Sequence, residues 1–254
     1  MSDNVHYDVE DGVATVRLDR PDKLNSLTLP MWEAVAEGMR RAERDEVRAA
    51  VLTGTGEAFC SGDDIGTLDA IEGPRDLREL ADTVLDCFGA IENTAVPVVG
   101  KANGSAYGGG FELLLACDLT VAPADATFSL PEVRIGAYPF YGAKRLARMV
   151  GRQRAADVAM AGRELSGREA VDWGLFARAV GDGEIDAAVA DVVSGLKKAS
   201  PTSLETTKSF LNASLEFAGE DDAMRAGLGY LFAGDDAREG AKAFVEKRDP
   251  DFAE

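Results

Sequence analysis

The chain has 254 residues, of which 46% are hydrophobic and 28% are charged, so it can bury a large core without disulfides or metal. Acidic residues outnumber basic ones by 45 to 27, which gives a formal net charge of −18, and such a surface repels the phosphates of nucleic acids. No apolar run approaches the roughly 18 residues that a membrane span needs, and residues 1–10 do not resemble a signal peptide. We therefore expect a cytoplasmic protein that binds neither nucleic acid nor membrane.

The acidic residues are spread along the chain and do not form a single tail. A highly acidic surface repels itself less at high ionic strength, because counter-ions screen the charges. The composition therefore favours a salt-adapted source, and an acidic protein from an ordinary source is the alternative.

The amino-terminal part of the chain begins with alternating apolar residues on both sides of an Asp11-Gly12 turn. This pattern predicts a β-hairpin over residues 5–18. A helix is expected over residues 28–44, and a short buried strand is expected over residues 48–53.

The middle of the chain alternates between helix and strand patterns. Apolar residues at i, i+3, i+4 and i+7 predict an amphipathic helix over residues 77–91. Residues 96–102 and 119–122 are expected to form strands, and residues 111–117 a helix between them.

The carboxyl-terminal part is predominantly helical in pattern. Residues 166–169 form a capping box that opens a helix ending at Gly174. From about residue 184 the pattern is helical to the end of the chain, with a break at Ser200-Pro201. The prediction is an α/β core of strand-strand-helix units over residues 1–195 and a helical region over residues 196–254.

Cysteine and histidine are too scarce to supply the usual metal or nucleophile chemistry. The three cysteines, Cys60, Cys87 and Cys117, are widely spaced and include no C-x-x-C pair, so neither a zinc site nor a disulfide framework is indicated. The single histidine, His6, lies in the alternating strand pattern and is expected on a strand surface. The chemistry must therefore depend on carboxylates and backbone amides.

Three consecutive glycines, Gly108 to Gly110, lie between a strand-like and a helix-like run, and Glu112 follows them. Because glycine has no Cβ, a ligand can approach the backbone closely, and a helix start offers free N–H groups and a positive dipole end. Donors for a developing oxyanion beside a carboxylate suggest catalysis. The alternative is that Glu112 only complements the helix dipole, which is worth about 0.3–1 kcal/mol.

Three further segments place polar residues next to turns, namely residues 20–27, 58–65 and 128–136, the last of which contains Glu132. Neither the dinucleotide pattern G-x-G-x-x-G nor a phosphate-binding P-loop is present. Each segment is a weak signal alone, since a glutamate after a proline is typical of a solvated loop.

In combination and in this order, the segments closely resemble the crotonase superfamily, the enoyl-CoA hydratases and isomerases. Five family patterns match and together span essentially the whole chain. They are R-P-x-K-x-N-[AS]-L at residues 20–27, F-[CS]-[AS]-G-x-D at 59–64, G-G-G-x-E-L at 108–113, P-E-x-x-x-G at 131–136 and E-G-x-x-A-F-x-E-K-R at 239–248.

The resemblance implies a spiral α/β fold of strand-strand-helix units with a carboxyl-terminal helical trimerisation region, assembled as a trimer or a dimer of trimers. It also implies an acyl-CoA thioester substrate and no metal or redox cofactor, because coenzyme A is part of the substrate. The family's oxyanion hole consists of two backbone N–H groups, which map to Asp63 and Gly109. These donors would hold the thioester oxygen as it becomes enolate-like.

Hydratases of the superfamily use two glutamates, which map to Glu112 and Glu132. One carboxylate can activate water for attack at Cβ while the other, protonated, delivers a proton to Cα. Isomerases commonly keep one acid only, so the presence of both favours hydration of a 2-enoyl-CoA. An enoyl-CoA isomerase is the nearest alternative, and a non-catalytic acyl-CoA-binding or RNA-binding protein on this scaffold is an alternative of another class, although the net charge argues against RNA.

Two positions depart from the family pattern. Asp63 stands where a small or apolar residue is usual, and its carboxylate would oppose a developing oxyanion unless it were turned away or paired. Phe140 stands where a hydratase backbone amide helps to hold the water, and its ring could reshape the acyl pocket.

The resemblance also indicates residues that contact the substrate and its coenzyme A portion. Lys23 lies in the CoA-contact segment, and Lys247 matches a carboxyl-terminal lysine that reaches the nucleotide, often that of an adjacent subunit. The complete predicted set is Lys23, Leu24, Ser61, Asp64, Ile65, Gly108, Phe140 and Lys247.

Overall fold

The computed structural model describes residues 2–64, 74–135 and 139–214, together with residues 246, 248 and 251. Ten strands of this part form two sheets, ordered β1-β2-β3-β5-β7-β10 and β4-β6-β8-β9. The first sheet contains β1 (Val5–Glu10), β2 (Val13–Leu18), β3 (Ala49–Gly54), β5 (Val98–Lys101), β7 (Leu119–Pro123) and β10 (Arg178–Val180). The second contains β4 (Ala58–Cys60), β6 (Ser105–Tyr107), β8 (Thr127–Ser129) and β9 (Leu165–Ser166).

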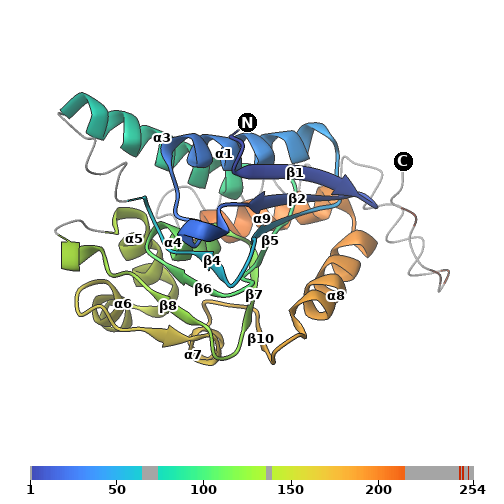
Figure 1. Ribbon diagram of the computed structural model, residues 1–254. Helices are drawn as coiled ribbons and strands as arrows, with labels where there is room; N and C mark the ends of the chain where they lie inside the picture. Colours follow the sequence, from blue (N-terminus) through green and yellow to red (C-terminus); the bar gives the residue numbers. More distant parts are fainter. Residues whose placement is uncertain are drawn as a thin grey trace.

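The helices of the described residues lie in the connections between these strands, apart from the last two, which follow β10 (Figure 1). They are η1 (Pro21–Lys23), α1 (Leu29–Arg44), α3 (Pro74–Asn93), α4 (Gly109–Ala116), η2 (Glu132–Ile135), α5 (Phe140–Val150), α6 (Arg152–Ala159), α7 (Gly167–Asp172), α8 (Ile185–Lys198) and α9 (Pro201–Ala213).

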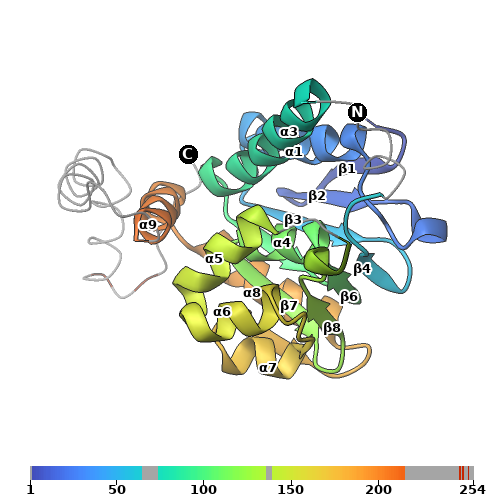
Figure 2. The same ribbon diagram turned by 90° about the vertical axis from the view of Figure 1, so that its left-hand side faces the viewer.

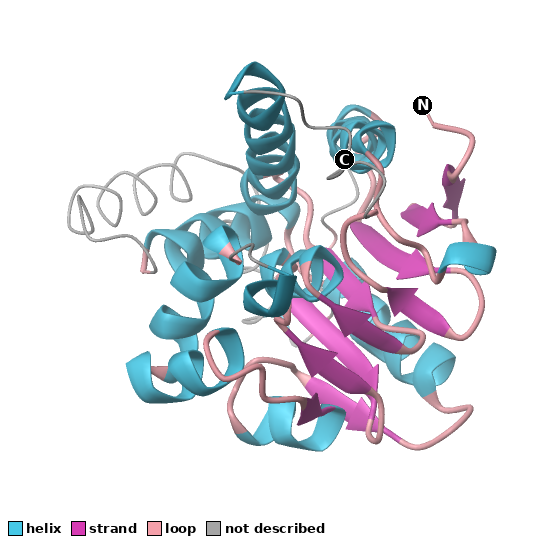
Figure 3. Ribbon diagram, turned by 60° about the vertical axis from the view of Figure 1, so that its left-hand side comes forward, coloured by secondary structure: helices cyan, strands magenta, loops and turns pink. Residues whose placement is uncertain are grey.

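The chain winds as a spiral between the two sheets, whose strands are magenta in Figure 3. Strands β3, β5 and β7 belong to the larger sheet, and each is followed by a strand of the smaller sheet, β4, β6 or β8. A helical segment then returns the chain to the larger sheet, or after β8 first to β9. The expected spiral of strand-strand-helix units is therefore confirmed.

The larger sheet is buried on both faces, because alternate residues of each strand enter different cores. In β3, Ala50 and Leu52 belong to the main core, whereas Ala49 and Val51 belong to a second core with residues of α8. Figure 1 shows α1 and α3 on one side of the sheet and α8 on the other. The near-continuous apolar composition of these strands follows from this double burial.

Most of the long elements lie where their patterns predict them. The hairpin forms as expected, with Asp11 and Gly12 both at positive φ, the conformation that the tightest hairpin turn requires. The predicted helix over residues 28–44 is α1, and the capping box at Ser166 is complete in both directions. Helix α4 begins at Gly109, two residues before the predicted start at 111, so two of the three glycines lie inside it.

The sequence patterns do not reveal the smaller sheet or helices α5 and α6. Strands β4, β6 and β8 have only three residues each, which is too short for a two-residue period to be visible. Their pairing with one another decides their structure, and that pairing is not local.

Helix α9 is attached to the core through a buried lysine. Lys208 Nζ lies 2.8 Å from Asp118 Oδ2 and donates to the carbonyls of Ile91 and Val96 at 2.8 and 3.1 Å. The pair connects α9 to the end of α3 and to the turn between α4 and β7, although α9 extends away from the sheets (Figure 2).

The predicted division at residue 195 falls within α8, which packs on the larger sheet. Residues 215–245 lie outside the described residues, so the helical trimerisation region and the two-part division stay predictions. Among the described residues, no helix has both the length and the apolarity of a membrane span.

We expect a Lys208→Met variant to lose about 3 kcal/mol of unfolding free energy, because Asp118 would remain buried without its cation. Urea unfolding monitored by circular dichroism, at matched protein concentration, measures the change. The double variant Lys208→Met/Asp118→Asn should recover much of the loss. A single variant as stable as the original chain would contradict this account of α9.

Candidate active site

Two segments far apart in sequence, residues 24–27 and 61–64, lie paired in the structure. The amide of Leu27 donates to the Gly62 carbonyl, and the amide of Asp64 donates to the Leu27 carbonyl, both at 2.8 Å. Leu27 and Asp63 form an isolated parallel bridge. The motifs at residues 20–27 and 59–64 are thus hydrogen-bonded to each other.

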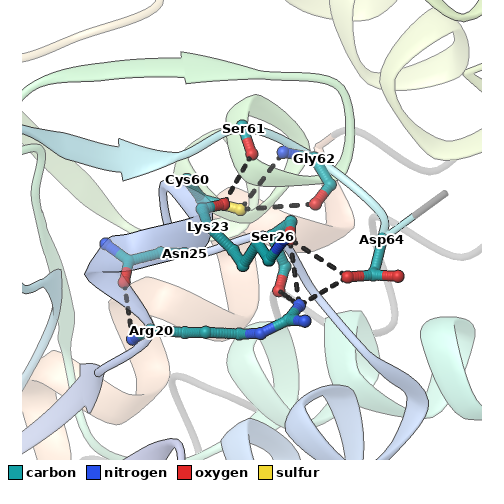
Figure 4. A network of polar contacts seen from close by, with 8 residues as sticks. All are labelled: Arg20, Lys23, Asn25, Ser26, Cys60, Ser61, Gly62 and Asp64. Carbon is teal, nitrogen blue, oxygen red and sulfur yellow. Dashed lines mark hydrogen bonds and ion pairs between the residues drawn. The ribbon is translucent and has the colours of Figure 1, made fainter. Parts of the chain in front are cut away.

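Asn25 holds this pair of segments to the strand before them. It is fully buried, and its side-chain Nδ2 donates to the carbonyls of Thr55, Ala58 and Phe59 at 2.9 to 3.1 Å. Its Oδ1 accepts from the Arg20 amide at 2.9 Å, as Figure 4 shows. One side-chain amide therefore satisfies four backbone groups at once.

An ion pair closes the outer side of these segments (Figure 4). Arg20 Nη1 lies 2.5 Å from Asp64 Oδ2 and also donates to Ser26 Oγ at 3.0 Å. Both charged side chains are about four-fifths buried, with 21% of each exposed. The carboxylate of Asp64 is therefore neutralised by Arg20, whereas that of Asp63, one residue earlier, points elsewhere.

The predicted coenzyme A contacts that are described gather near this pair of segments. Lys23 ends η1 and is exposed, Leu24 is 42% exposed, and Ser61 Oγ donates to the Lys23 carbonyl at 3.4 Å. Ile65 and Lys247 lie outside the described residues. Phe140 is the first residue of α5, and only its backbone position is described.

The smaller sheet brings the remaining predicted site residues together. Strands β4, β6 and β8 are parallel neighbours, so their carboxyl ends lie at one edge of the sheet. Asp63 follows β4, the triple glycine follows β6, and Glu132 follows β8. Three segments with no sequence relationship therefore meet at that edge.

Each of the three positions, 108, 109 and 110, requires glycine for a different structural reason. Gly108 is the residue before α4 and has φ of 53° with ψ of −131°, a conformation that a side chain disfavours strongly. A Cβ on Gly109 would lie 2.8 Å from Trp32 Cζ2, and one on Gly110 would lie 2.6 Å from Cys60 Cβ. Glycine thus lets the start of α4 pack directly on β4 and α1.

The first amides of α4 have no partner within the helix. The first intrahelical bond runs from the Glu112 amide to the Gly108 carbonyl at 2.9 Å, so the Gly109 amide lies before it. The positive end of the helix dipole adds to the attraction for an anion at this point.

Glu112 lies in the first turn of α4 and is only 4% exposed. Its Oε1 accepts from the Gly142 amide at 2.6 Å, in the first turn of α5. Burial raises the pKa of Glu112 to about 8, against the lowering effect of the Gly142 amide, and the charges of Glu132 and Asp63 raise it further. Glu112 can therefore hold or release a proton near neutral pH.

Glu132 is the first residue of η2, and its Oε1 lies 3.1 Å from the position of a Cβ on Gly108. Its Oε2 is buried without a hydrogen-bond partner in the described structure. Burial raises the pKa of Glu132 to about 7, its own amide lowers it, and the charge of Asp63 raises it. Because unsatisfied buried oxygens are rare in folded proteins, Oε2 is suited to a substrate or water partner.

The carboxyl group of Asp63, which was expected to be turned away or paired, has a hydrogen-bond partner, and that partner is a neutral donor. Trp32 Nε1 donates to Asp63 Oδ1 at 2.8 Å, and Trp32 is fully buried in α1. Burial raises the pKa of Asp63, while the Trp32 indole and the residue's own amide lower it.

Two residues of this site, Trp32 and Gly142, were not predicted from the sequence. Trp32 belongs to the apolar face of an amphipathic helix, where an aromatic residue is ordinarily part of the core. Gly142 follows Phe140 by two residues, and it is Gly142 whose amide binds Glu112. The amide of Phe140 as a holder of water stays a prediction.

The described residues contain no cluster of histidine, cysteine or acidic side chains arranged to bind a metal. Cys60, Cys87 and Cys117 are free and buried, and burial raises the pKa of each thiol. His6 pairs with Asp19 on the surface of the hairpin at 2.8 Å. The arrangement thus offers two proton-carrying glutamates beside free helix amides, which suits the stabilisation of an enolate and proton transfer to carbon.

Known proteins resemble the whole chain. The sequence profile of a family described as enoyl-CoA hydratase/isomerase matches residues 8–254. A probable enoyl-CoA hydratase of Rhodobacter capsulatus is 35% identical, over 98% of this chain and 97% of its own. The mevalonyl-coenzyme A hydratase sidH of Aspergillus fumigatus is 32% identical, over 94% of this chain and 91% of its own.

Solved structures agree with this similarity. An enoyl-CoA hydratase of Mycobacterium smegmatis superposes with a TM-score of 0.93 at 28% identity, with both chains covered completely. An enoyl-CoA hydratase subunit of Geobacillus kaustophilus gives a TM-score of 0.90 at 32% identity, covering 98% of this chain and 97% of its own.

We expect Glu112→Gln to stabilise the protein increasingly as pH rises. The folded pKa of about 8 lies above the ordinary value of 4.5, so the folded state retains a proton that the unfolded state loses between these values. The unfolding free energy of the wild-type protein therefore falls as the pH rises from 4.5 to about 8, by about 1.4 kcal/mol for each pH unit. Glutamine keeps the acceptor for Gly142 and has no such dependence.

Urea unfolding of both proteins at pH 5 and pH 8 checks this expectation. The difference in unfolding free energy should be small at pH 5 and should favour the variant at pH 8. A constant difference at the two pH values would contradict the raised pKa.

Proposed function

The chain belongs to the enoyl-CoA hydratase/isomerase family, and we propose that it adds water reversibly to a 2-enoyl-CoA thioester to give a 3-hydroxyacyl-CoA. The observation that carries this proposal is the meeting of Glu112 and Glu132 at the amino terminus of α4, the first buried and the second half-buried, both with pKa values that burial raises toward neutrality. Hydratase relatives that match nearly the full chain support it.

The two glutamates divide the proton transfers of the reaction. One carboxylate takes a proton from water as its oxygen attacks Cβ, and the other, protonated, gives its proton to Cα. The two groups interact, so their titration is a property of the pair, and a pair with one proton at neutral pH suits this exchange. The product gains both hydrogens of the water, and the pair is left with one proton as before.

The thioester oxygen becomes negative when Cβ is attacked, and the backbone amides of Asp63 and Gly109 are the donors that would hold it. Their suitability comes from position, because Gly109 offers an amide without an intrahelical partner and Asp63 lies directly beside Gly109. Each donor of such a pair typically contributes about 2.7–4 kcal/mol to lowering the barrier. The reaction needs no metal or redox cofactor.

Double-bond isomerisation is the competing reaction, since it uses the same enolate with one acid. The raised pKa values of the two carboxyl groups lower the unfolding free energy at neutral pH. A protein that only bound acyl-CoA would gain nothing from this loss of stability. The pair therefore favours hydration over both alternatives.

The remaining features of the proposal concern binding, assembly and surroundings. Lys23 and Lys247 are the cations proposed to meet the coenzyme A phosphates, together with contacts from the segment around Ser61 and Asp64. We propose a homotrimer or a dimer of trimers in the cytoplasm of a salt-adapted cell, consistent with the net charge of −18. High KCl should then favour binding of the anionic substrate, because it screens the repulsion.

We expect crotonyl-CoA to lose its conjugated-thioester absorbance in the presence of the protein, in low and in high KCl. Glu112→Gln and Glu132→Gln should each lower kcat by about 10² or more, since each removes a proton-transfer group. A 3-enoyl-CoA assayed in parallel tests isomerisation. Conjugation formed from the 3-enoyl-CoA without hydration of crotonyl-CoA would overturn the proposal.

We also expect Gly142→Ala to lower kcat about 10²-fold with a smaller effect on KM. The new Cβ would lie 2.9 Å from Glu112 Oε1 and 2.8 Å from Leu130 Cδ1, so the buried carboxyl must move, and small displacements of a catalytic group are costly. Gly195→Ala, in α8, where nothing lies within 4 Å of the new Cβ, is the control for a glycine-to-alanine change within a helix. Equal kcat in both variants would contradict the role given to Gly142.

A further inference from the structure

The amide that binds Glu112 comes from the first turn of α5. The first hydrogen bond within that helix runs from the Ala143 amide to the Pro139 carbonyl at 2.8 Å. The Gly142 amide, one residue earlier, therefore has no partner inside the helix, and it donates instead to Glu112 Oε1 at 2.6 Å. The direction of this hydrogen bond depends on how the start of α5 is placed against α4.

Tyr141, the residue before Gly142, contacts α3 at two points. Its ring stacks on the buried ring of Phe88, with the centroids 3.8 Å apart and the planes at 14° to each other. Its hydroxyl donates to Glu92 Oε1 at 2.8 Å. Phe88 and Glu92 lie one turn apart on the same face of α3, so the stack and the hydrogen bond together fix both the plane and the direction of the phenol.

Arg145 adds a second attachment from the next turn of α5. Its Nη1 lies 2.8 Å from the same oxygen of Glu92, and its Nε donates to the Leu115 carbonyl of α4 at 3.2 Å. The side chains of Arg145 and Glu92 are only 13% and 23% exposed, so solvent screens this pair less than it does a surface ion pair. Successive turns of α5 are thus bound to α3 and α4.

Glu92 is itself fixed, because α9 binds the end of α3. Asn212 Nδ2 donates to the Glu92 carbonyl at 2.7 Å, and Lys208 Nζ donates to the Ile91 carbonyl at 2.8 Å. Both carbonyls belong to the last turn of α3, where a helix has no partners of its own for them. The hydroxyl of Tyr141 is therefore bonded to a carboxylate that is held in place by three helices.

Taking the proposed hydration as its premise, we propose that Tyr141 is a positioning residue for Glu112. The phenol fixes the start of α5 on α3, and the Gly142 amide, next in the chain, then fixes Oε1 of Glu112. Because an amide N–H only donates, Oε1 stays an acceptor, and the proton that Glu112 takes or gives is carried by Oε2. Tyr141 thereby decides which oxygen of Glu112 exchanges the proton, and it takes no part in the transfer itself.

The hydroxyl of Tyr141 is suited to this role because it remains a donor. Burial, and next the charge of Glu92, raise the pKa of this hydroxyl, so it keeps its proton over the pH range in which the glutamates titrate. The alternative is that the same contacts serve folding alone. That alternative predicts a loss of stability without a specific loss of proton transfer.

Tyr141→Phe keeps the ring on Phe88 and removes only the hydroxyl. We expect kcat for crotonyl-CoA to fall about tenfold and KM to change less than about twofold, because small displacements of a catalytic group are costly. Tyr7→Phe is the matched control, since the Tyr7 hydroxyl donates to Asp45 Oδ2 at 2.9 Å beside Arg41, on the hairpin and α1. It should leave kcat unchanged, and equal losses in the two variants would contradict the role of Tyr141.

The Glu112→Gln background separates positioning from folding. Glutamine keeps an acceptor for the Gly142 amide but transfers no proton, so adding Tyr141→Phe should lower the residual kcat less than about twofold, as expected of residues that act as a unit. A loss of about tenfold in both backgrounds would show that Tyr141 acts independently of Glu112, and it would overturn the proposal.

The amide resonance of Gly142 reports its hydrogen bond without turnover. In protein labelled with ¹⁵N-glycine it is identified by its loss in Gly142→Ala, and we expect it to shift in Tyr141→Phe and in Glu112→Gln but not in Tyr7→Phe. If crotonyl-CoA is hydrated but the resonance keeps its wild-type position in Tyr141→Phe, the role of Tyr141 is wrong and the hydration stands. If the resonance shifts as expected but no enoyl-CoA is hydrated, the proposed function fails instead.

Discussion

The architecture of the site depends on how closely the start of α4 approaches β4. A Cβ on Gly110 would lie 2.6 Å from both Cys60 Cβ and the Cys60 carbonyl oxygen, so only glycine permits this contact. The approach places helix amides without an intrahelical partner at the edge of the smaller sheet, where β4 and β8 also end. Asp63, Gly109 and Glu132 are neighbours because of that packing.

The same packing buries Glu112 and partly buries Asp63 and Glu132, which is unfavourable for the ionised forms of their carboxyl groups. Two neutral donors partly compensate: the Gly142 amide for Glu112 and the Trp32 indole for Asp63. Glu132 Oε2 is buried and unpartnered in the described structure. The proposed catalytic site therefore lowers the stability of the folded protein. Two ion pairs hold the surrounding segments in position: the outer pair of Arg20 and Asp64 and the buried pair of Lys208 and Asp118.

Long elements with many periodic residues were predictable from the sequence, and so were glycine, capping and hairpin signals that act within a few residues. The hairpin over residues 5–18, helix α1 and the capping box at Ser166 are examples. The motifs also identified the acids and the triple glycine as candidates. Trp32 and Gly142 escaped prediction because their roles come from contacts with Asp63 and Glu112, 31 and 30 residues away in the chain.

The sequence by itself determined the order of motifs, the acidic composition, the scarcity of histidine and the family to compare with. Only the tertiary structure decided that the three-residue strands β4, β6 and β8 pair in parallel, and that this pairing gathers Asp63, Gly109, Glu112 and Glu132. The physical reason is that such short strands have no preference strong enough to be visible locally, and they form because their partners satisfy their backbone groups. Burial, which sets the proton affinity of each carboxyl, is likewise a property of the assembled fold and not of any segment.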